Sequence, residues 1–437
     1  MDQASYANHL LILREELVLA LGCTEPIAVA LAAALARSVL GVEPERLEVA
    51  CSGSIIKNVK SVTVPNSGGL RGIEAAAILG AVGGDATASL EVLQGVTPQE
   101  LRRTRELLDQ PGYCSVTLEE GVPNLYVRVV ARAAGHEAVA RIEERHTNVT
   151  ELSLDGGATR EEAASRTPVG CEDLPVSSAA GRAERGALSL ASIWEFAHDT
   201  SLADVDELIS GQLSCNDKIS RAGLSGSWGS NIGSTLLASR SNDVCCRARA
   251  AAAAGSDARM SGCPLPVTIV CGSGNQGITC SAPVLEYARE LGASHEALVR
   301  AVVLSDLTAV HVKYYIGELS AFCGAVCAAC GAGAGIAYLR GCTFDQYGAT
   351  VVNTLANVGG IVCDGAKPSC AAKVSAAVDA AVLAGDMAFA DKSFKAGDGL
   401  VGADAERTIR TMGRVGRVGM RPTDVEILNI MIGKTDV

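Results

Sequence analysis

Two cysteines near the end of the chain, Cys363 and Cys370, have a spacing that suits metal binding. They lie seven positions apart in a Gly- and Pro-containing segment, residues 359–373, between two Ala- and Val-rich runs. Ser369 is placed to cap the helix predicted after this segment. Because intracellular thiols are kept reduced, two thiols on one loop favour a metal or a metal cluster over a disulfide.

A third thiol, Cys323, lies 40 positions before Cys363. Three thiolates can ligate three irons of a [4Fe–4S] cluster and leave the fourth iron open for a substrate. Zinc bound by three cysteines and a water molecule is the alternative. The spacing alone excludes neither kind of site.

Cys323 also begins a C-x3-C-x2-C pattern with Cys327 and Cys330, the spacing with which radical enzymes dependent on S-adenosylmethionine bind their cluster. Those enzymes usually carry an aromatic residue where this chain has Ala329, and no repeated βα pattern surrounds the three cysteines. Spacings of four and three place them on one face of a helix. The pattern therefore predicts one ligand and two packing residues.

Cys23 lies in the segment Gly-Cys-Thr-Glu-Pro, residues 22–26, directly before a long apolar run. Thr24 is a suitable N-cap and Pro26 is tolerated in a first turn, so the thiol is predicted at a helix N-terminus. The helix dipole favours a thiolate there, which is what a reactive cysteine needs. A buried packing cysteine is the alternative.

A glycine-rich loop, residues 272–277, follows a predicted strand at residues 267–270 and matches the dinucleotide fingerprint G-x-G-x-x-G. The fingerprint also requires a second strand, but residues 295–304 are predicted as a helix. The loop is therefore predicted to bind an anion or an amino-acid backbone. Arg259 precedes it and could pair with a ligand carboxylate or with a nearby acid such as Asp257.

Two further segments carry polar candidates. Asn58 and Lys60 precede a Gly-rich turn at residues 65–69, which could bind a carboxylate or could be a solvated loop. His146 titrates in a range that suits either a base or a structural histidine.

Composition limits the partners of this chain. Its 437 residues are 48% hydrophobic and carry a net charge of −12, without any block of Lys or Arg, so nucleic acid and anionic membrane are poor partners. The N-terminus lacks the features of a secretory signal, which predicts a cytoplasmic protein. Residues 319–339 are uncharged but rich in Gly and Ala, which favours a buried helix over a membrane span.

Hydrophobic periodicity predicts an α+β fold with a small α+β domain at residues 45–150 and a larger, mostly helical catalytic domain at residues 176–437. Residues 1–44 are predicted as helices of the catalytic domain, and the polar residues 151–175 as a linker. The small domain is expected to contain strands at residues 47–56, 114–118, 125–131 and 136–142, and helices at residues 73–79 and 98–108.

Taken together, the segments at residues 22–26, 146–148, 256–260, 272–277 and 363–367 resemble those of the L-cysteine desulfidase family, relatives of the iron–sulfur L-serine dehydratases (alpha subunit-like). The resemblance extends over most of the chain. It implies a [4Fe–4S] cluster ligated by Cys323, Cys363 and Cys370, and an active-site cysteine at Cys23.

The resemblance implies conversion of L-cysteine and water to pyruvate, ammonia and sulfide, with the open iron as a Lewis acid for the substrate sulfur. Cys23 is the first choice for the base and His146 the second; Cys23 could instead fill the open iron position at rest. An L-serine dehydratase and a non-catalytic metal-binding cysteine sensor are the alternatives. An amino acid is the expected partner, and a homo-oligomer is compatible with the sequence. The residues expected to hold the substrate's carboxylate and amine are Asn58, Lys60, Arg259, Ser273, Gly274, Asn275 and Gln276.

Overall fold

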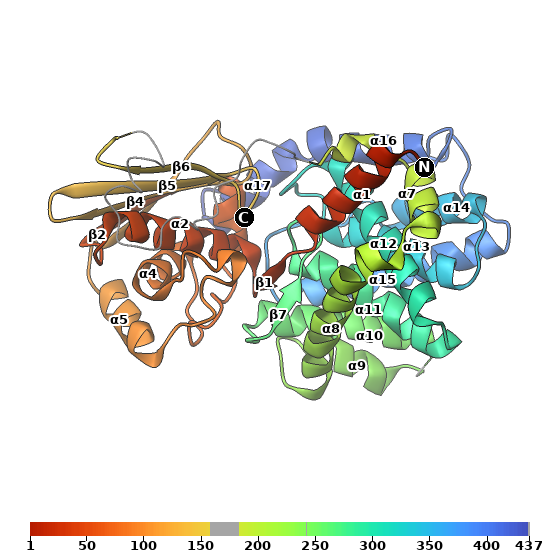
Figure 1. Cartoon of the computed structure of the whole chain (residues 1–437), viewed down its shortest axis with the longest axis horizontal. Helices are drawn as coiled ribbons and strands as arrows, with labels where there is room; N and C mark the ends of the chain where they lie inside the picture. Colours follow the sequence, from red (N-terminus) through yellow and green to blue (C-terminus); the bar gives the residue numbers. More distant parts are fainter. Residues whose placement is uncertain (158–182, 242, 436–437) are drawn as a thin grey trace.

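The computed structural model describes residues 1–157, 183–241 and 243–435. Figure 1 shows two parts side by side, a smaller part built on a sheet and a larger helical part. This arrangement confirms the predicted α+β class. Residues 158–175 of the predicted linker lie outside the described residues.

The smaller part is a five-stranded sheet with the order β3-β2-β4-β5-β6, in which only the β2–β3 pair is parallel. Buried residues alternate along β2, as expected for a strand with one face on the core. The predicted strands are confirmed, except that the first is shorter and a further strand, β6, follows residues 146–148. The bounds are β2 (Arg46–Cys51), β3 (Cys114–Leu118), β4 (Tyr126–Ala133), β5 (His136–Glu143) and β6 (Val149–Leu154).

Helices cover one face of this sheet (Figure 1). The helices that contact the sheet are α2 (Thr24–Leu40) and α4 (Ile73–Gly83). Beyond them, α5 (Pro98–Leu108) packs on α4, and a 3-10 turn, η1 (Ser89–Glu91), packs on α2. The Ala-rich α2 packs between the sheet and α4, and a Cβ at Gly80 would lie only 2.2 Å from the Ala30 carbonyl oxygen. Small residues therefore permit the close crossing of α2 and α4.

The packing differs from the sequence-based division at residue 44. The helix α1 (Gln3–Glu16) packs on the helical part, whereas α2 packs against α4 and the sheet in the core of the smaller part. The short β1 (Leu19–Leu21), which the sequence did not predict, pairs with β7 (Pro266–Thr268) of the helical part. Residues 53–56, predicted as the end of the first strand, and residues 57–59 before the Gly-rich turn instead form the helix α3 (Gly53–Val59).

The helical part is centred on α13, which packs against α11, α12, α14 and α15. A Cβ at Gly331 of α13 would lie 2.3 Å from the Ser305 carbonyl oxygen, so the Gly- and Ala-rich run at residues 319–339 is used for close helix packing. Among the described residues, no helix is long and apolar enough to cross a membrane. The helices are α7 (Leu190–Asp199), α8 (Leu202–Ser225), α9 (Ile232–Ser239), α10 (Val244–Met260), α11 (Gly274–Leu291), α12 (His295–Ile316), α13 (Gly324–Leu339), α14 (Phe344–Val358), α15 (Cys370–Phe389) and α16 (Ala405–Arg414), with a 3-10 turn, η3 (Arg185–Ala187).

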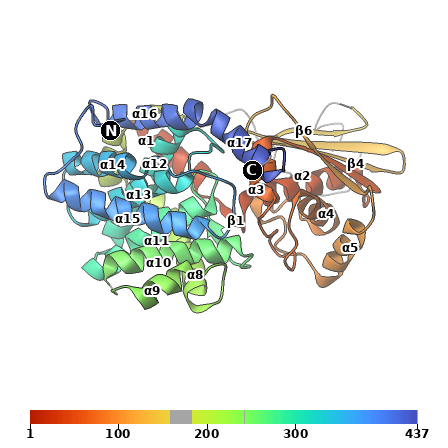
Figure 2. The same cartoon turned by 180° about the vertical axis from the view of Figure 1, so that it is seen from behind.

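The end of the chain returns to the smaller part. After a π-helical turn, η4 (Val415–Gly419), the helix α17 (Arg421–Met431) packs against α3, and Figure 2 shows it between the two parts. The buried Lys57 of α3 forms an ion pair with Asp424 of α17. The C-terminal helix thus connects the helical part to the smaller one.

Candidate active site

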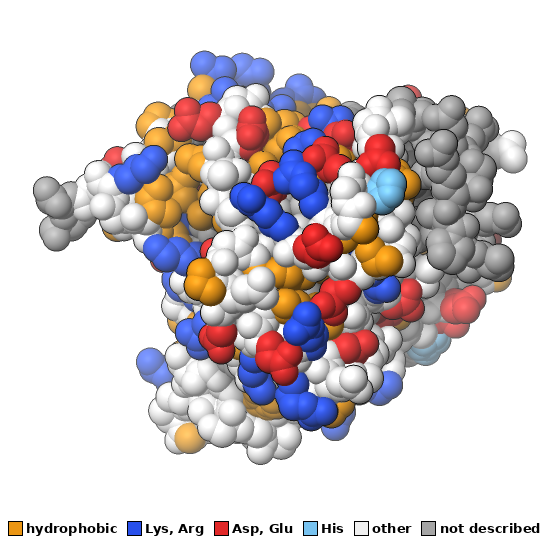
Figure 3. Space-filling model, turned by 90° about the vertical axis from the view of Figure 1, so that its left-hand side faces the viewer, with side chains coloured by type: hydrophobic (Ala, Val, Ile, Leu, Met, Phe, Trp, Pro, Cys, Tyr) orange, Lys and Arg blue, Asp and Glu red, His pale blue; other side chains and the backbone are white. Residues whose placement is uncertain are grey.

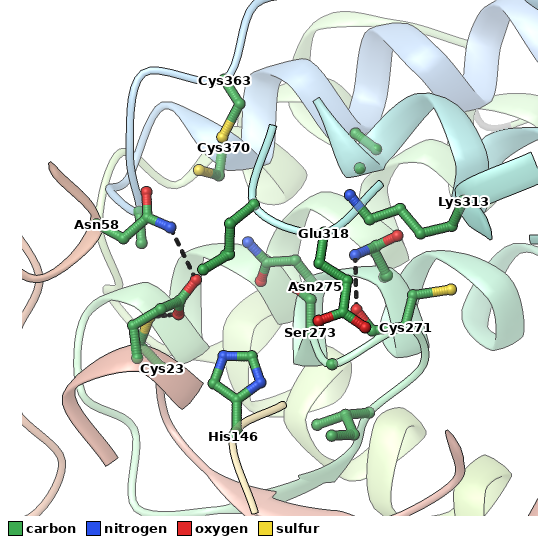
Figure 4. Close-up of a pocket in the computed structure, with 18 of the residues that line it drawn as sticks. Cys23, Asn58, His146, Cys271, Ser273, Asn275, Lys313, Glu318, Cys363 and Cys370 are labelled. Atoms are coloured by element: carbon green, nitrogen blue, oxygen red, sulfur yellow. Dashed lines mark hydrogen bonds between the residues drawn. The ribbon is translucent and has the colours of Figure 1, made fainter. Parts of the chain in front are cut away.

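A cavity of about 180 Å³ lies where the two parts meet (Figure 4). Its walls come from the start of α2, from α3, from the turn between β5 and β6, and from the loops before α11, α13 and α15. Segments far apart in the sequence therefore surround one space. The predicted site residues that line it are Cys23, Asn58, His146, Arg259, Ser273, Asn275, Gln276, Cys323, Cys363 and Cys370.

The three predicted ligands lie on one wall of the cavity. Cys323 is the N-cap of α13, Cys370 is the first residue of α15, and Cys363 lies on the loop between α14 and α15. Two backbone hydrogen bonds fasten this loop: the Cys363 N–H donates to the Ala321 carbonyl (2.6 Å) and the Cys323 N–H donates to the Ile361 carbonyl (2.9 Å). Ser369 occupies the N-cap of α15, although its side chain makes no capping hydrogen bond.

Electrostatics distinguishes these thiols. Hydrogen bonding from the Cys323 thiol lowers the pKa of Cys363 to about 6 against the effect of burial, and the nearby Lys57 ammonium and the Gly365 N–H act in the same direction. The same hydrogen bond, together with burial, raises the pKa of Cys323 well above its usual value. The hydrogen-bonded pair of Cys323 and Cys363 therefore favours one negative charge, which the two sulfurs share.

The three thiols are the predicted ligands of a metal or a metal cluster. Within the described ranges, no three His, Cys, Asp or Glu side chains are arranged to hold one metal ion. A [4Fe–4S] cluster needs three thiolates, each bound to a different iron, with the fourth iron open. Three thiols on one wall beside Lys57 and Lys373 fit such a group chemically. Ligation by these residues stays a prediction.

Cys23 is held in a short chain of hydrogen bonds. Its thiol donates to Glu25 Oε2 (2.9 Å), and Asn58 Nδ2 donates to Glu25 Oε1 (3.0 Å). Burial raises the pKa of Cys23 well above its usual value, and the neighbouring Glu25 charge raises it further. In the protein alone, burial and the Glu25 charge thus favour the neutral thiol, in the direction opposite to the helix dipole.

Glu25 is the ionised member of this group. Burial raises its pKa, but His146, the Cys23 thiol and Arg259 together hold it below its ordinary value. Burial lowers the pKa of His146, so its ring is uncharged at neutral pH, where Cys23 and Arg259 still stabilise the carboxylate. Glu25 lies two positions after Cys23 in the sequence but was not predicted as a site residue.

Arg259 is 3% exposed, and its Nε and Nη2 have no hydrogen-bond partner among the described residues. Among the described residues no hydrogen bond joins Arg259 Nε or Nη2 to Asp257, which accepts instead from the backbone N–H groups of Ser230 (3.2 Å) and Ile232 (2.7 Å). A Cβ at Gly274 would lie 2.3 Å from Arg259 Nε. Gly274 thus leaves room for the guanidinium instead of lining the cavity.

Other polar atoms around the cavity are also without partners in the described part of the chain. They are Asn58 Oδ1, His146 Nε2, Asn275 Oδ1 and Gln276 Oε1. Buried polar groups are normally hydrogen-bonded, so this concentration of unpaired donors and acceptors indicates a site for a polar ligand.

One predicted residue lies elsewhere. Lys60 is exposed, and its Nζ donates to the Met431 carbonyl at the end of α17, because α3 turns it away from the cavity. The sequence also missed residues that line the cavity. Lys313 and Glu318 come from a long helix and the turn after it, and no local motif marks them.

The fold and the cavity define an α+β protein with a thiol-lined polar pocket between its two parts. A family model described as serine dehydratase alpha chain matches residues 87–429. The chain belongs to this family.

Similar full-length proteins occur in several bacteria. A UPF0597 protein of Lachnoclostridium phytofermentans is 46% identical over 427 residues, which cover 98% of this chain and 100% of that protein. A UPF0597 protein of Desulfitobacterium hafniense is 47% identical over 98% of this chain and 97% of its own length. A third, from Finegoldia magna, is 43% identical over 98% of this chain and all of its own length.

Proposed function

We propose that the protein is an L-cysteine desulfidase, which converts L-cysteine to pyruvate, ammonia and sulfide by β-elimination. The observation that carries the proposal is the unpaired guanidinium of Arg259 in a cavity that three thiols line from another wall. A buried charge without a partner is costly, so this Arg suits a ligand carboxylate, which it can bind through two parallel hydrogen bonds. Membership of the serine dehydratase alpha chain family supports elimination chemistry on an amino acid.

The proposed cofactor is a [4Fe–4S] cluster ligated by Cys323, Cys363 and Cys370. When bound, it would supply a Lewis acid at its open iron. The role of the chain is to hold the loop that carries Cys363: the buried Lys57 ammonium donates to the Cys363 carbonyl (3.5 Å) and is itself held by Asp424.

The remaining cavity residues would orient the substrate. Arg259 would hold its carboxylate, and the unpaired Asn58, Asn275 and Gln276 oxygens would accept from its ammonium group. Backbone N–H groups at the start of α11, where Ser273 is the N-cap, add positive potential for the carboxylate.

Cys23 is the proposed acceptor of the Cα proton. Glu25 accepts the hydrogen bond of the Cys23 thiol, so it can take that proton while the sulfur removes the proton from Cα. The raised pKa makes the thiolate a strong base once it forms. His146, uncharged and with Nε2 free of any partner in the described residues, is the alternative base.

L-Serine is the second candidate substrate, favoured by the description of the family. The carboxylate, the ammonium group and the Cα proton are the same in both amino acids, and only the leaving group differs. The residues that bind these shared groups therefore do not discriminate between cysteine and serine.

The test is release of sulfide and pyruvate from L-cysteine by anaerobically reconstituted protein, with L-serine alongside. Sulfide with little turnover of serine is the expected result. Pyruvate from serine alone would establish the dehydratase instead, and binding of cysteine without turnover of either would indicate a sensor. Arg259→Gln should raise KM by roughly 10-fold to 100-fold, because hydrogen bonds to charged groups contribute about 1.5–3 kcal/mol.

A further inference from the structure

A buried lysine borders the cavity without a partner. Lys313 lies in the last turn of α12 and is 9% exposed. In the part of the chain that the structure describes, its Nζ makes no hydrogen bond or ion pair, and the neighbouring Glu318 is not in ion-pair contact with it. Buried ammonium groups are almost always paired, so an unpaired one beside a cavity indicates that a ligand brings the anion.

The other cations near the cavity already have assigned partners or roles. Lys57 pairs with Asp424, Lys373 with Asp364, and Arg145 with Glu15. Arg259, the remaining cation, is the proposed carboxylate site. This leaves Lys313, among the described residues, as a positive charge available to a second part of the substrate.

The position of Lys313 in the cavity indicates which part of the substrate it would contact. Figure 4 shows its ammonium pointing into the cavity from the side opposite Cys23 and His146. Lys313 lines the same cavity as Cys323, Cys363 and Cys370, so its charge can act on a group bound at the wall of the three thiols. A substrate whose Cα faces Cys23 therefore directs its β-substituent toward that wall and Lys313.

We propose that Lys313 is the general acid of the elimination and donates a proton to the atom that leaves Cβ. This inference rests on the proposed function. The base removes the Cα proton, its electron pair forms the Cα–Cβ double bond, and the Cβ–S bond breaks with its pair on sulfur. The departing HS⁻ takes a proton from Lys313, which gives hydrogen sulfide, 2-aminoacrylate and a neutral amine that water reprotonates.

The test compares leaving groups of different basicity in Lys313→Met. Chloride needs no proton, hydrosulfide benefits from one, and hydroxide requires one. General acid catalysis typically contributes about 10²–10⁴-fold. Elimination from L-serine should therefore fall most, elimination from L-cysteine less, and elimination from β-chloro-L-alanine by no more than about twofold, since only the proton transfer is removed.

Two further variants make the result decisive. Lys313→Arg keeps the positive charge but cannot donate a proton at neutral pH. Its elimination rates should therefore fall in the same order, most for L-serine, less for L-cysteine and least for β-chloro-L-alanine. This variant keeps the test valid even if Lys313→Met folds poorly. Lys218→Met, an exposed lysine of α8, is the matched control and should leave all three rates unchanged. Thermal unfolding and iron content of each variant check that the fold and the cofactor are retained.

The two proposals fail in different ways. Equal losses for all three substrates, or no loss for L-cysteine and L-serine, would overturn the role of Lys313 while the wild-type activity stands. A wild-type protein that eliminates from none of the three would overturn the proposed function and this inference with it.

Discussion

Two groups of cysteines in the helical part have opposite surroundings. The cavity thiols, Cys323, Cys363 and Cys370, lie at helix starts and on a loop, beside lysines. The core thiols, Cys280, Cys327 and Cys330, are fully buried between α11, α12 and α13. Burial raises the pKa of Cys327 to about 11 and those of Cys280 and Cys330 well above the usual range. Of the three cavity thiols only Cys363 has a lowered pKa, and burial also raises the pKa values of Cys323 and Cys370. The two groups therefore differ first in their access to the cavity.

The comparison explains why the C-x3-C-x2-C pattern is not one site. Cys323 is the N-cap of α13 and lines the cavity, whereas Cys327 and Cys330 lie one and two turns inside the helix and are buried in its packing. The expectation that the latter two are packing residues is confirmed by their burial. Of the three cysteines in this pattern, one therefore lines the cavity and two lie in the helical core.

The largest effect is expected for Cys363→Ser. A serine hydroxyl at this position cannot replace the thiolate that the loop stabilises, so bound iron, its brown absorbance and turnover should all be lost. Iron per chain and visible absorbance of anaerobically reconstituted protein measure the effect.

The control comes from the core thiols. Cys330→Ala should retain full iron and activity while lowering the free energy of unfolding by about 1 kcal/mol, because it removes one buried sulfur. Undiminished iron in Cys363→Ser, or lost iron in Cys330→Ala, would contradict the prediction that the cavity thiols bind iron and the core thiols do not.

Cys23→Ala tests the role of a cavity thiol that is not a predicted ligand of the cluster. The variant should keep its iron but lose about 10²–10⁴-fold in kcat, the usual contribution of a positioned acid or base. The measurement is turnover at saturating L-cysteine together with iron content. Normal turnover would make Cys23 a packing residue and transfer the role of base to His146.

The sequence predicted the elements of the smaller part well, because their signals are local. The helix at residues 98–108 and the strand at residues 114–118 have the bounds of α5 and β3. Thr97 is the N-cap of this helix and forms a capping box with Glu100, so the local sequence marks where the helix begins. Signals of this kind do not depend on tertiary packing.

The rest depended on tertiary packing. The sequence assigned residues 1–44 to the helical part, whereas α2 packs against the sheet and α4. An apolar Ala-rich helix can be buried in either part, so its place follows from long-range contacts. Lys60 was expected at the site and Lys313 was not, because the orientation of α3 and the approach of α12 to the cavity follow from long-range contacts. Motif segments predicted most of the cavity, and helix packing supplied the remainder.

A smaller effect is expected for Asp424→Asn, which removes the partner of Lys57 behind the cavity thiols. Lys57 is 2% exposed and also contacts the Cys363 carbonyl, so an uncompensated ammonium should shift this loop. Changes of this kind behind metal ligands typically weaken metal binding by about 10–100-fold. Iron retention against a chelator measures it.

Lys60→Met is the matched control, since Lys60 contacts the same helix from the exposed side. Its iron retention should equal that of the wild type. Equal loss in both variants would mean that α17 as a whole, and not the Lys57 ion pair, supports the loop.

The smallest effect concerns the core thiols and their neighbour Asp306. This carboxyl is 1% exposed, accepts from Gln212 Nε2 (3.0 Å), and burial raises its pKa to about 8. Its unfolded pKa is lower, so the folded state retains a proton that the unfolded state releases. The stability that this group contributes is complete below the unfolded value near pH 4 and is lost as the pH rises toward 8.

Asp306→Asn removes that dependence because an amide resembles the protonated acid and does not titrate. The variant should gain free energy of unfolding over the wild type by about 1.4 kcal/mol per pH unit between pH 5 and 7, as the linkage relation requires. Denaturant unfolding at pH 5, 6 and 7 measures the difference. A difference that stays constant with pH would mean that Asp306 is ionised in the folded protein, and that the core around Cys280 is less apolar than its burial indicates.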